Sequence, residues 1–153
     1  MKLAVAFSLA EQRFALPVQW VEQVVRAVAV TPLPKAPPVV RGIIDFRGEV
    51  VPVMDIRQRL DLPSRPMALS DQIIIARASG RHIAFCVEAI IGVVEWDGAD
   101  FVATNTIVSG VEFLDGVVRN QEGMILVYDP DAFFLPAEQL MLDQAMGQDH
   151  VHG

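Results

Sequence analysis

Residue types that commonly carry chemistry are few in this sequence and lie far apart. Its three histidines are His82, His150 and His152, and the last two form a His-x-His pair with no cysteine nearby. This pair lacks the i, i+4 spacing with which a helix holds a metal ion, so we predict no metal site. The single cysteine, Cys86, excludes an intramolecular disulfide and lies in an apolar run, which favours a buried thiol.

Motifs of known catalytic sites are also missing from the sequence. It contains no G-x-S-x-G elbow, H-E-x-x-H helix, P-loop or dinucleotide-binding fingerprint. Asp45 and Asp55 could be read as an acid–base pair, but Asp55 is better explained as the N-cap of a short helix over residues 56–60. We therefore predict that the protein is not an enzyme, has no catalytic residues and uses no cofactor.

The composition predicts a packed globular protein that avoids polyanionic partners. Apolar residues make up 52% of the chain and charged residues 20%, which is typical of a folded domain. The formal net charge of −7 repels phosphate backbones and anionic lipid surfaces, so we predict no nucleic-acid partner. No apolar run approaches the ~20 residues that a membrane-spanning helix requires, so we expect a cytoplasmic protein with no direct membrane insertion.

The elements that would position any functional residue come from two related halves of the chain. Residues 14–19 match residues 83–88 at an offset of 69. A second block, Gly-Ile-Ile at residues 42–44, recurs as Gly-Val-Val at residues 116–118, at an offset of 74. Each copy of this second block is followed, at the same distance, by an aspartate, Asp55 or Asp129. The chain therefore contains an internal duplication.

Short β-branched runs bounded by turn residues predict that both halves are built from strands. Residues 73–75 and 50–54 are examples, and the alternating apolar pattern of residues 3–9 predicts an N-terminal strand. We predict an all-β fold with short helices, in which two five-stranded β-barrels pack on a shared hydrophobic core. The residues expected in that core include Leu16, Val51, Phe85 and Leu126.

Helical signals are confined to short segments. Pro17 can begin a helix in which Val18, Val21 and Val25 share one face, and Pro136 can begin an amphipathic C-terminal helix that reaches residue 146. We assign residues 1–147 to a single domain of two duplicated barrel subdomains, and residues 148–153 to a flexible tail.

Arg47 is the charged residue whose position is most closely defined by its neighbours. It precedes Gly48 between two apolar strands, so a tight turn should hold its guanidinium at one place on the surface. One interpretation is a solvated turn charge. The other is a binding residue, because arginine is enriched at interface hot spots and its planar fork orients a partner.

The segment from Gly42 to Arg57 resembles the signature of the CheW family of bacterial chemotaxis coupling proteins, roughly G-V-x-N-L-R-G-x-V-V-P-V-x-D-L-R. The resemblance extends over nearly the whole chain and implies two SH3-like β-barrels. It also implies an adaptor in a two-component system, which couples the cytoplasmic tip of methyl-accepting chemoreceptors to the regulatory domain of the histidine kinase CheA. Such an adaptor would be recruited from the cytoplasm to membrane-associated receptor arrays.

The resemblance also implies a protein-binding surface. Its residues would be Arg47 and Asp45 of the signature, Val21 and Gln23 on the expected first-half helix, Ile73 at the start of the second half, and Val93. Two positions depart from the family pattern: Asp45-Phe46 replaces Asn-Leu, and Gln23 stands where one branch of the family has glutamate. A CheW-like paralogue that serves a secondary chemosensory cluster is therefore one alternative, and a small-molecule-sensing β-barrel is another.

Overall fold

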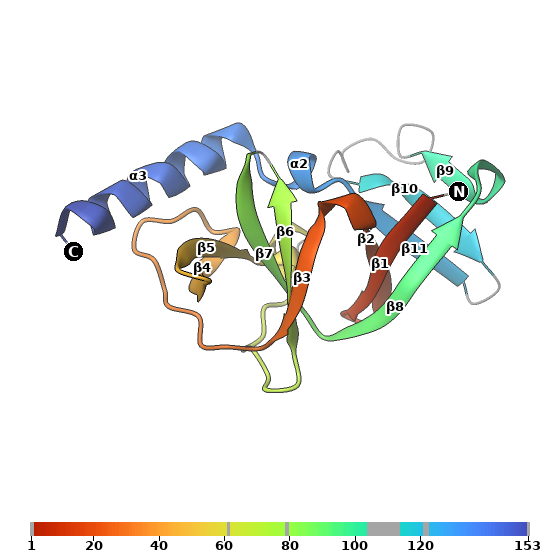
Figure 1. The fold of residues 1–153 in the computed structure, drawn as a ribbon, viewed down its shortest axis with the longest axis horizontal. Helices are drawn as coiled ribbons and strands as arrows, with labels where there is room; N and C mark the ends of the chain where they lie inside the picture. The colour runs from red at the N-terminus through yellow and green to blue at the C-terminus, as the bar shows by residue number, and fades with distance from the viewer. Residues whose placement is uncertain (1, 61, 79, 104–113, 121–122, 153) are drawn as a thin grey trace.

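The computed structural model describes residues 2–60, 62–78, 80–103, 114–120 and 123–152, with the backbone alone for residues 120 and 148–152. The chain is mostly β, with two sheets and a few short helices, as the sequence predicts (Figure 1). β1 lies near one end of the molecule and α3 (Pro136–His152) extends to the other. Among the described helices, none is both long and apolar enough to cross a membrane.

The strands form two separate sheets. Sheet A has the order β8 (Ala89–Trp96), β1 (Lys2–Leu9), β2 (Gln12–Pro17), β11 (Gly123–Tyr128), β10 (Leu114–Asn120) and β9 (Phe101–Ala103). Sheet B has the order β3 (Val21–Arg26), β6 (Gln72–Ala78), β7 (Arg81–Val87), β5 (Glu49–Met54) and β4 (Val40–Phe46). Sheet A thus gains a short sixth strand, β9, beyond the five that we predicted.

Strand pairing confirms the duplication and shows that the halves exchange a strand. β5 runs parallel to β7 with Val53 opposite Ala84, and β11 runs parallel to β2 with Val127 opposite Ala15. Val53 and Val127 are related by the offset of 74 found in the sequence, and Ala15 and Ala84 by the offset of 69. The third strand of each half, β3 or β8, pairs with the first strand of the other half, β6 or β1. Each sheet is therefore built from both halves.

Sheet B curls until the segment after β3 meets β4 at the opposite edge. The amide of Thr31 donates to the carbonyl of Ile43 at 2.9 Å, and the amide of Ile43 donates back at 2.8 Å. This close approach of the two backbones requires glycine at residue 42, because a Cβ on Gly42 would lie 2.5 Å from the carbonyl oxygen of Thr31. Gly116, its counterpart in the duplication, is equally close to the backbone of Val102.

One hydrophobic cluster spans both sheets, as the shared-core prediction requires. Its aromatic rings form a chain in which Phe14 lies 5.2 Å from Tyr128, Tyr128 lies 5.7 Å from Phe133, and Phe133 lies 5.2 Å from Phe85. Leu16 and Phe85 are fully buried in this cluster, and Val51 is buried in a second cluster within sheet B. Leu126 is only partly buried but packs against the shared cluster, whereas its neighbours on β11, Ile125 and Val127, belong to a third cluster in sheet A.

The prediction of a helix that begins at Pro17 is wrong. A single 3₁₀ turn, η1 (Val18–Trp20), leads directly into β3. Valine is β-branched and favours a strand, and in β3 Val24 and Val25 lie opposite Ile74 and Ile73 of β6. Val21 and Gln23 therefore lie on a strand.

Two duplicated aspartates begin two short helices, as predicted for Asp55. The side chain of Asp55 accepts the amide of Gln58 ahead of α1 (Ile56–Arg59), and that of Asp129 accepts the amide of Asp131 ahead of α2 (Pro130–Phe133). A second 3₁₀ turn, η2 (Gly98–Asp100), precedes β9.

The C-terminal helix begins at Pro136, as the sequence predicts, and its backbone remains helical to His152. Leu142 and Ala145 are buried against the body of the protein. Ion pairs of Arg59 with Glu138, and of Arg81 with Asp143, also tie α3 to the body. The division into residues 1–147 and a tail from 148 stays a prediction, although residues 148–152 continue the helix.

Candidate interaction surface

The β4–β5 hairpin closes with a two-residue loop, Arg47-Gly48, between the paired residues Phe46 and Glu49. Both loop residues have positive φ, +54° at Arg47 and +82° at Gly48, which is the type I′ geometry that matches the twist of a hairpin. The carboxylate of Asp45 accepts the amide of Gly48 at 2.8 Å. Asp45 and Asp55 thus both bind backbone amides, which accounts for these carboxylates without an acid–base pair.

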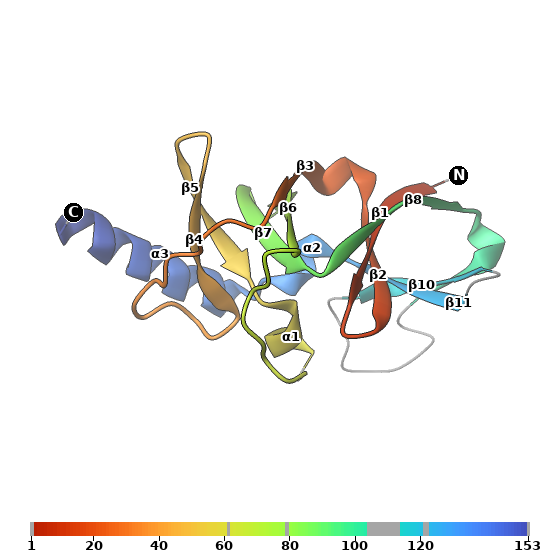
Figure 2. The ribbon, with the colours of Figure 1, turned by 90° about the horizontal axis from the view of Figure 1, so that it is seen from below.

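Arg47 is held by two neighbours, so its guanidinium has a defined orientation. Its Nη2 donates to Oε1 of Gln23 at 2.5 Å, and its Cζ lies 4.9 Å from the centre of the Phe46 ring. Figure 2 shows the β4–β5 hairpin projecting from the body of the protein. We call Gln23, Asp45, Phe46 and Arg47 the hairpin surface.

The other predicted contact residues lie in different surroundings. Val21 is half-buried against the shared core. Val93 is 64% exposed on β8, an edge strand of sheet A, and is therefore not part of the hairpin surface. Ile73 is fully buried, because β6 lies between β3 and β7 and both of its faces are covered. We therefore remove Ile73 from the predicted contacts.

Sequence reasoning missed an ionic cluster beside the hairpin surface. His82 of β7 places Nδ1 2.6 Å from a carboxylate oxygen of Glu49 on β5, and Nε2 3.0 Å from one of Glu22 on β3. Its ring packs against that of Phe46 in a T-shaped arrangement, with 6.1 Å between the ring centres. Contact with Glu22 and then with Glu49 raises the pKa of His82, although burial opposes the rise. A histidine and two glutamates so far apart in sequence give no local motif.

Asp71 is the buried polar residue of the described core, and it anchors the loop that precedes β6. Its carboxylate accepts two bonds from Arg65, at 2.8 and 3.1 Å, and one from the amide of Ala68 at 2.9 Å. Burial opposes ionisation, but these donors keep the pKa of Asp71 below its ordinary value. The thiol of Cys86 lies 3.7 Å from the same carboxylate, and burial raises its pKa to about 11. Cys86 is thus a buried, protonated thiol, as predicted.

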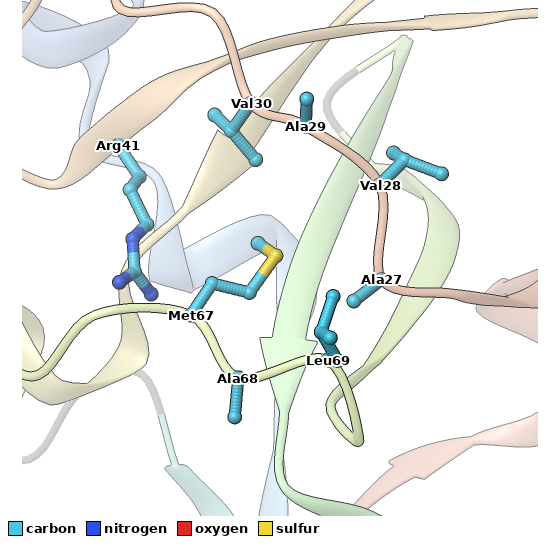
Figure 3. Close-up of a pocket in the computed structure, with 8 residues that line it drawn as sticks. All are labelled: Ala27, Val28, Ala29, Val30, Arg41, Met67, Ala68 and Leu69. Atoms are coloured by element: carbon cyan, nitrogen blue, oxygen red, sulfur yellow. The ribbon is translucent and has the colours of Figure 1, made fainter.

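An open groove of about 440 Å³ lies between the segment after β3 and the loop that contains Met67 (Figure 3). Its lining is mainly apolar, and Val28 and Leu69 are 46% and 98% exposed. The side chain of Arg41 borders it and donates to the carbonyl of Arg65 at 2.5 Å. The groove belongs to one sheet and opens to solvent, whereas a small-molecule-sensing barrel was expected to bind in the seam between the barrels.

The described residues also contain no group of three histidine, cysteine or acidic side chains that could hold a metal ion. The arrangement as a whole offers oriented hydrogen-bond donors, exposed apolar side chains and a rigid frame. These features suit the binding of another protein.

Comparison with known proteins identifies the family. Residues 3–137 match the family model described as CheW-like domain. This chain belongs to the CheW-like family. Its hairpin surface is therefore part of a CheW-like fold, and the signature from Gly42 to Arg57 corresponds to β4, the Arg47-Gly48 turn, β5 and the start of α1.

Curated relatives and a solved structure agree with this assignment. Chemotaxis protein CheW of Rhizobium meliloti (strain 1021) is 29% identical over 137 residues, which cover 88% of both chains. Chemotaxis protein CheW of Thermotoga maritima is 27% identical over 126 residues, 82% of this chain and 83% of the relative. The crystal structure of the scaffolding protein TtCheW from Thermoanaerobacter tengcongensis superposes with a TM-score of 0.80 at 28% identity, over 87% of this chain and 92% of that one. The protein is a CheW-family chemotaxis adaptor, a scaffold of two SH3-like β-barrels.

Proposed function

We propose that this adaptor couples the cytoplasmic tip of methyl-accepting chemoreceptors to the regulatory domain of the histidine kinase CheA by protein–protein binding alone. In this proposal it is a cytoplasmic protein that receptor arrays recruit to the membrane, and the hairpin surface is one of its contacts. The observation that carries the assignment of the surface is the orientation of Arg47 by Gln23 and Phe46.

An oriented arginine binds a partner at a lower entropic cost than a mobile one. Ordering a long, exposed side chain on binding costs about 0.5–1.5 kcal/mol, and the turn and Gln23 have already ordered Arg47. A guanidinium carries five N–H donors, and Gln23 accepts from one nitrogen, so Arg47 can donate to a carboxylate or carbonyl of a partner at the same time. Arg47 is therefore the residue on which we centre the interface.

A second contact surface is proposed around Val93. On β8, Val93 and Ile91 are 64% and 48% exposed, and Leu3 of the neighbouring strand β1 is 43% exposed. This apolar stripe lies on sheet A, whereas the hairpin surface lies on sheet B. Two surfaces on two sheets suit an adaptor that binds two different partners at once. Val21, at the start of β3, is proposed to support the first surface from its half-buried position.

The test is a binding assay with the receptor signalling fragment and the kinase regulatory domain, first separately and then together. We expect both to bind, and a ternary complex to form. Arg47→Glu should weaken one of the two complexes, and Val93→Glu the other. Arg26→Glu is a matched control, because Arg26 is an exposed arginine on β3. Failure to bind either protein would overturn the proposal.

A role in a secondary chemosensory cluster is supported by Asp45. An asparagine at this position could also accept the amide of Gly48, so the aspartate changes the charge of the hairpin surface without a need to change the turn. Such a difference affects the choice of partner rather than the fold.

A further inference from the structure

His82 joins two parts of sheet B that are not neighbours in the sheet. Glu22 lies on the edge strand β3, and Glu49 lies at the start of β5, with β6 and β7 between these strands. The two ring nitrogens of His82 face one glutamate each, at 3.0 and 2.6 Å. The histidine side chain is 14% exposed, whereas those of Glu22 and Glu49 are 37% and 51% exposed. The imidazole thus lies beneath two surface carboxylates and connects them.

Only the protonated imidazole matches this arrangement. A neutral imidazole has one N–H donor and one acceptor nitrogen, whereas the imidazolium has two donors. Both glutamates present acceptor oxygens, so a neutral His82 would direct a lone pair at one of them. The contact of Nε2 with Glu22 has the distance of an ion pair but lacks the direction of a good hydrogen bond, so it depends on charge.

Other charged groups around His82 also favour ionised carboxylates. Arg47 and Arg77 act on Glu22 from the hairpin and from β6, and His82 is the largest influence that keeps the pKa of Glu22 below its ordinary value. Arg81, the next residue toward the N-terminus of β7, pairs with Asp143 of α3 at 2.5 Å. The immediate surroundings of His82 are therefore two carboxylates and the Phe46 ring, which packs against it in a T-shaped arrangement.

A β-bulge links this cluster to the hairpin surface. In the pairing of β3 with β6, Val21 lies opposite Ala76 and Gln23 opposite Ile75, so Glu22 is the extra residue of the bulged strand. Bulges re-aim side chains that would otherwise alternate between faces. Consecutive residues can therefore both approach the hairpin, Glu22 toward His82 and Gln23 toward Arg47.

We propose that protonated His82 ties β3 to the β4–β5 hairpin, and that loss of this proton loosens the Arg47–Gln23 contact, so that partner binding at the hairpin surface depends on pH. His82 is thus a positioning residue, and the inference rests on the function proposed above. The folded protein raises the pKa of His82 above its ordinary value of 6.5. The tie is therefore complete below pH 6.5 and is lost as the pH rises through the pKa of His82 in the folded protein.

The experiment measures the affinity of the receptor signalling fragment and of the kinase regulatory domain between pH 6 and 8.5, together with an NMR titration of the His82 ring in the adaptor alone. Wild type should bind the partner that requires Arg47 about three- to tenfold more weakly at pH 8.5. A tenfold change in affinity corresponds to a difference of about one unit between the pKa of His82 in the bound and in the free adaptor. The midpoint should follow the His82 titration. His82→Gln should show no such step, and its affinity should equal that of wild type at high pH.

Two controls separate this inference from the proposed function. The variant H150Q/H152Q leaves His82 as the sole histidine and should keep the wild-type profile. In the adaptor alone, the side-chain amide resonances of Gln23 should shift with the midpoint of His82, and H82Q should abolish the shift. Binding that is independent of pH, or Gln23 resonances that ignore the His82 titration, would overturn the tie while the proposed function stands. Absence of binding at every pH would overturn the proposed function, and the Gln23 resonances would then decide the tie.

Discussion

Arg47 occupies a strained turn position and also forms the centre of the hairpin surface, and two substitutions separate these roles. Arg47→Asn removes the guanidinium but places the residue type that type I′ turns prefer ahead of Gly48. Arg47→Glu removes the guanidinium, keeps a side chain that is disfavoured at a φ of +54°, and reverses the charge.

The stability cost of each substitution follows from the contacts of Arg47. Both variants lose an exposed hydrogen bond to Gln23 and a cation–π contact with the ring of the buried Phe46, together about 1–2 kcal/mol. Asparagine should recover part of this loss through its tolerance of positive φ, so we expect Arg47→Asn to lie within about 1 kcal/mol of wild type. Glutamate recovers none of this loss and adds a like charge near Glu22, so Arg47→Glu should be the less stable of the two variants. Both should remain folded.

Binding should change far more than stability. A hot-spot arginine contributes at least ~2 kcal/mol, so Arg47→Asn should raise the Kd for one partner about thirtyfold or more, and charge reversal should raise it further. The assays are a thermal melt, calorimetric titration with each partner, and a reconstituted receptor–kinase phosphorylation reaction. Arg26→Glu should leave the affinities for both partners unchanged. If folded Arg47→Asn and Arg47→Glu bind both partners as wild type does, Arg47 is a solvated turn charge and the hairpin surface is not an interface.

Three further predictions concern the core, the partner choice and the first hairpin. Truncation of the fully buried Phe85 to alanine should destabilise the protein by about 3–5 kcal/mol in denaturant melts, and a loss below ~1 kcal/mol would contradict the shared core. Asp45→Asn should leave the melt unchanged but broaden binding toward the partners of ordinary family members, which a competition assay with those partners checks. Ala10 and Glu11 both have positive φ, +52° and +65°, so Ala10→Asn combined with Glu11→Gly should raise the Tm by about 2–4 °C; a lower Tm would argue against strain in this turn.

The local capping was predictable because it depends on residues close together in sequence: Asp55 begins α1 through an amide only three residues away. The duplication was predictable because it is a match between segments of the sequence itself, and the pairings of Val53 with Ala84 and of Val127 with Ala15 repeat at its offsets. The exchange of β3 and β8 was not predictable. Both halves carry similar β-branched strands, so pairing within a half and pairing across halves satisfy the same hydrophobic pattern.

The errors at individual residues share this cause. Valines at residues 18, 21 and 25 match a helical face, and only the isoleucines of β6, almost 50 residues later, decide in favour of a strand. Ile73 enters the predicted contacts through the family resemblance, and the sequence alone does not show that β6 has a neighbour on each side. The sequence shows no local motif at His82, since Glu22 and Glu49 are remote in sequence and meet it only when sheet B curls.

Strand exchange also explains how a chain without catalytic motifs can act as a coupling protein. A scaffold that joins two partners must hold two binding surfaces in a fixed relation, and the two surfaces proposed for this protein lie on different sheets, the hairpin surface on sheet B and the Val93 stripe on sheet A. Neither sheet can form from one half of the chain, because β3 needs β6 and β8 needs β1. The aromatic chain from Phe14 to Phe85 then fills the space between the sheets. The relative position of the two surfaces is therefore set by the same pairing and packing that stabilise the fold, rather than by a linker between independent barrels.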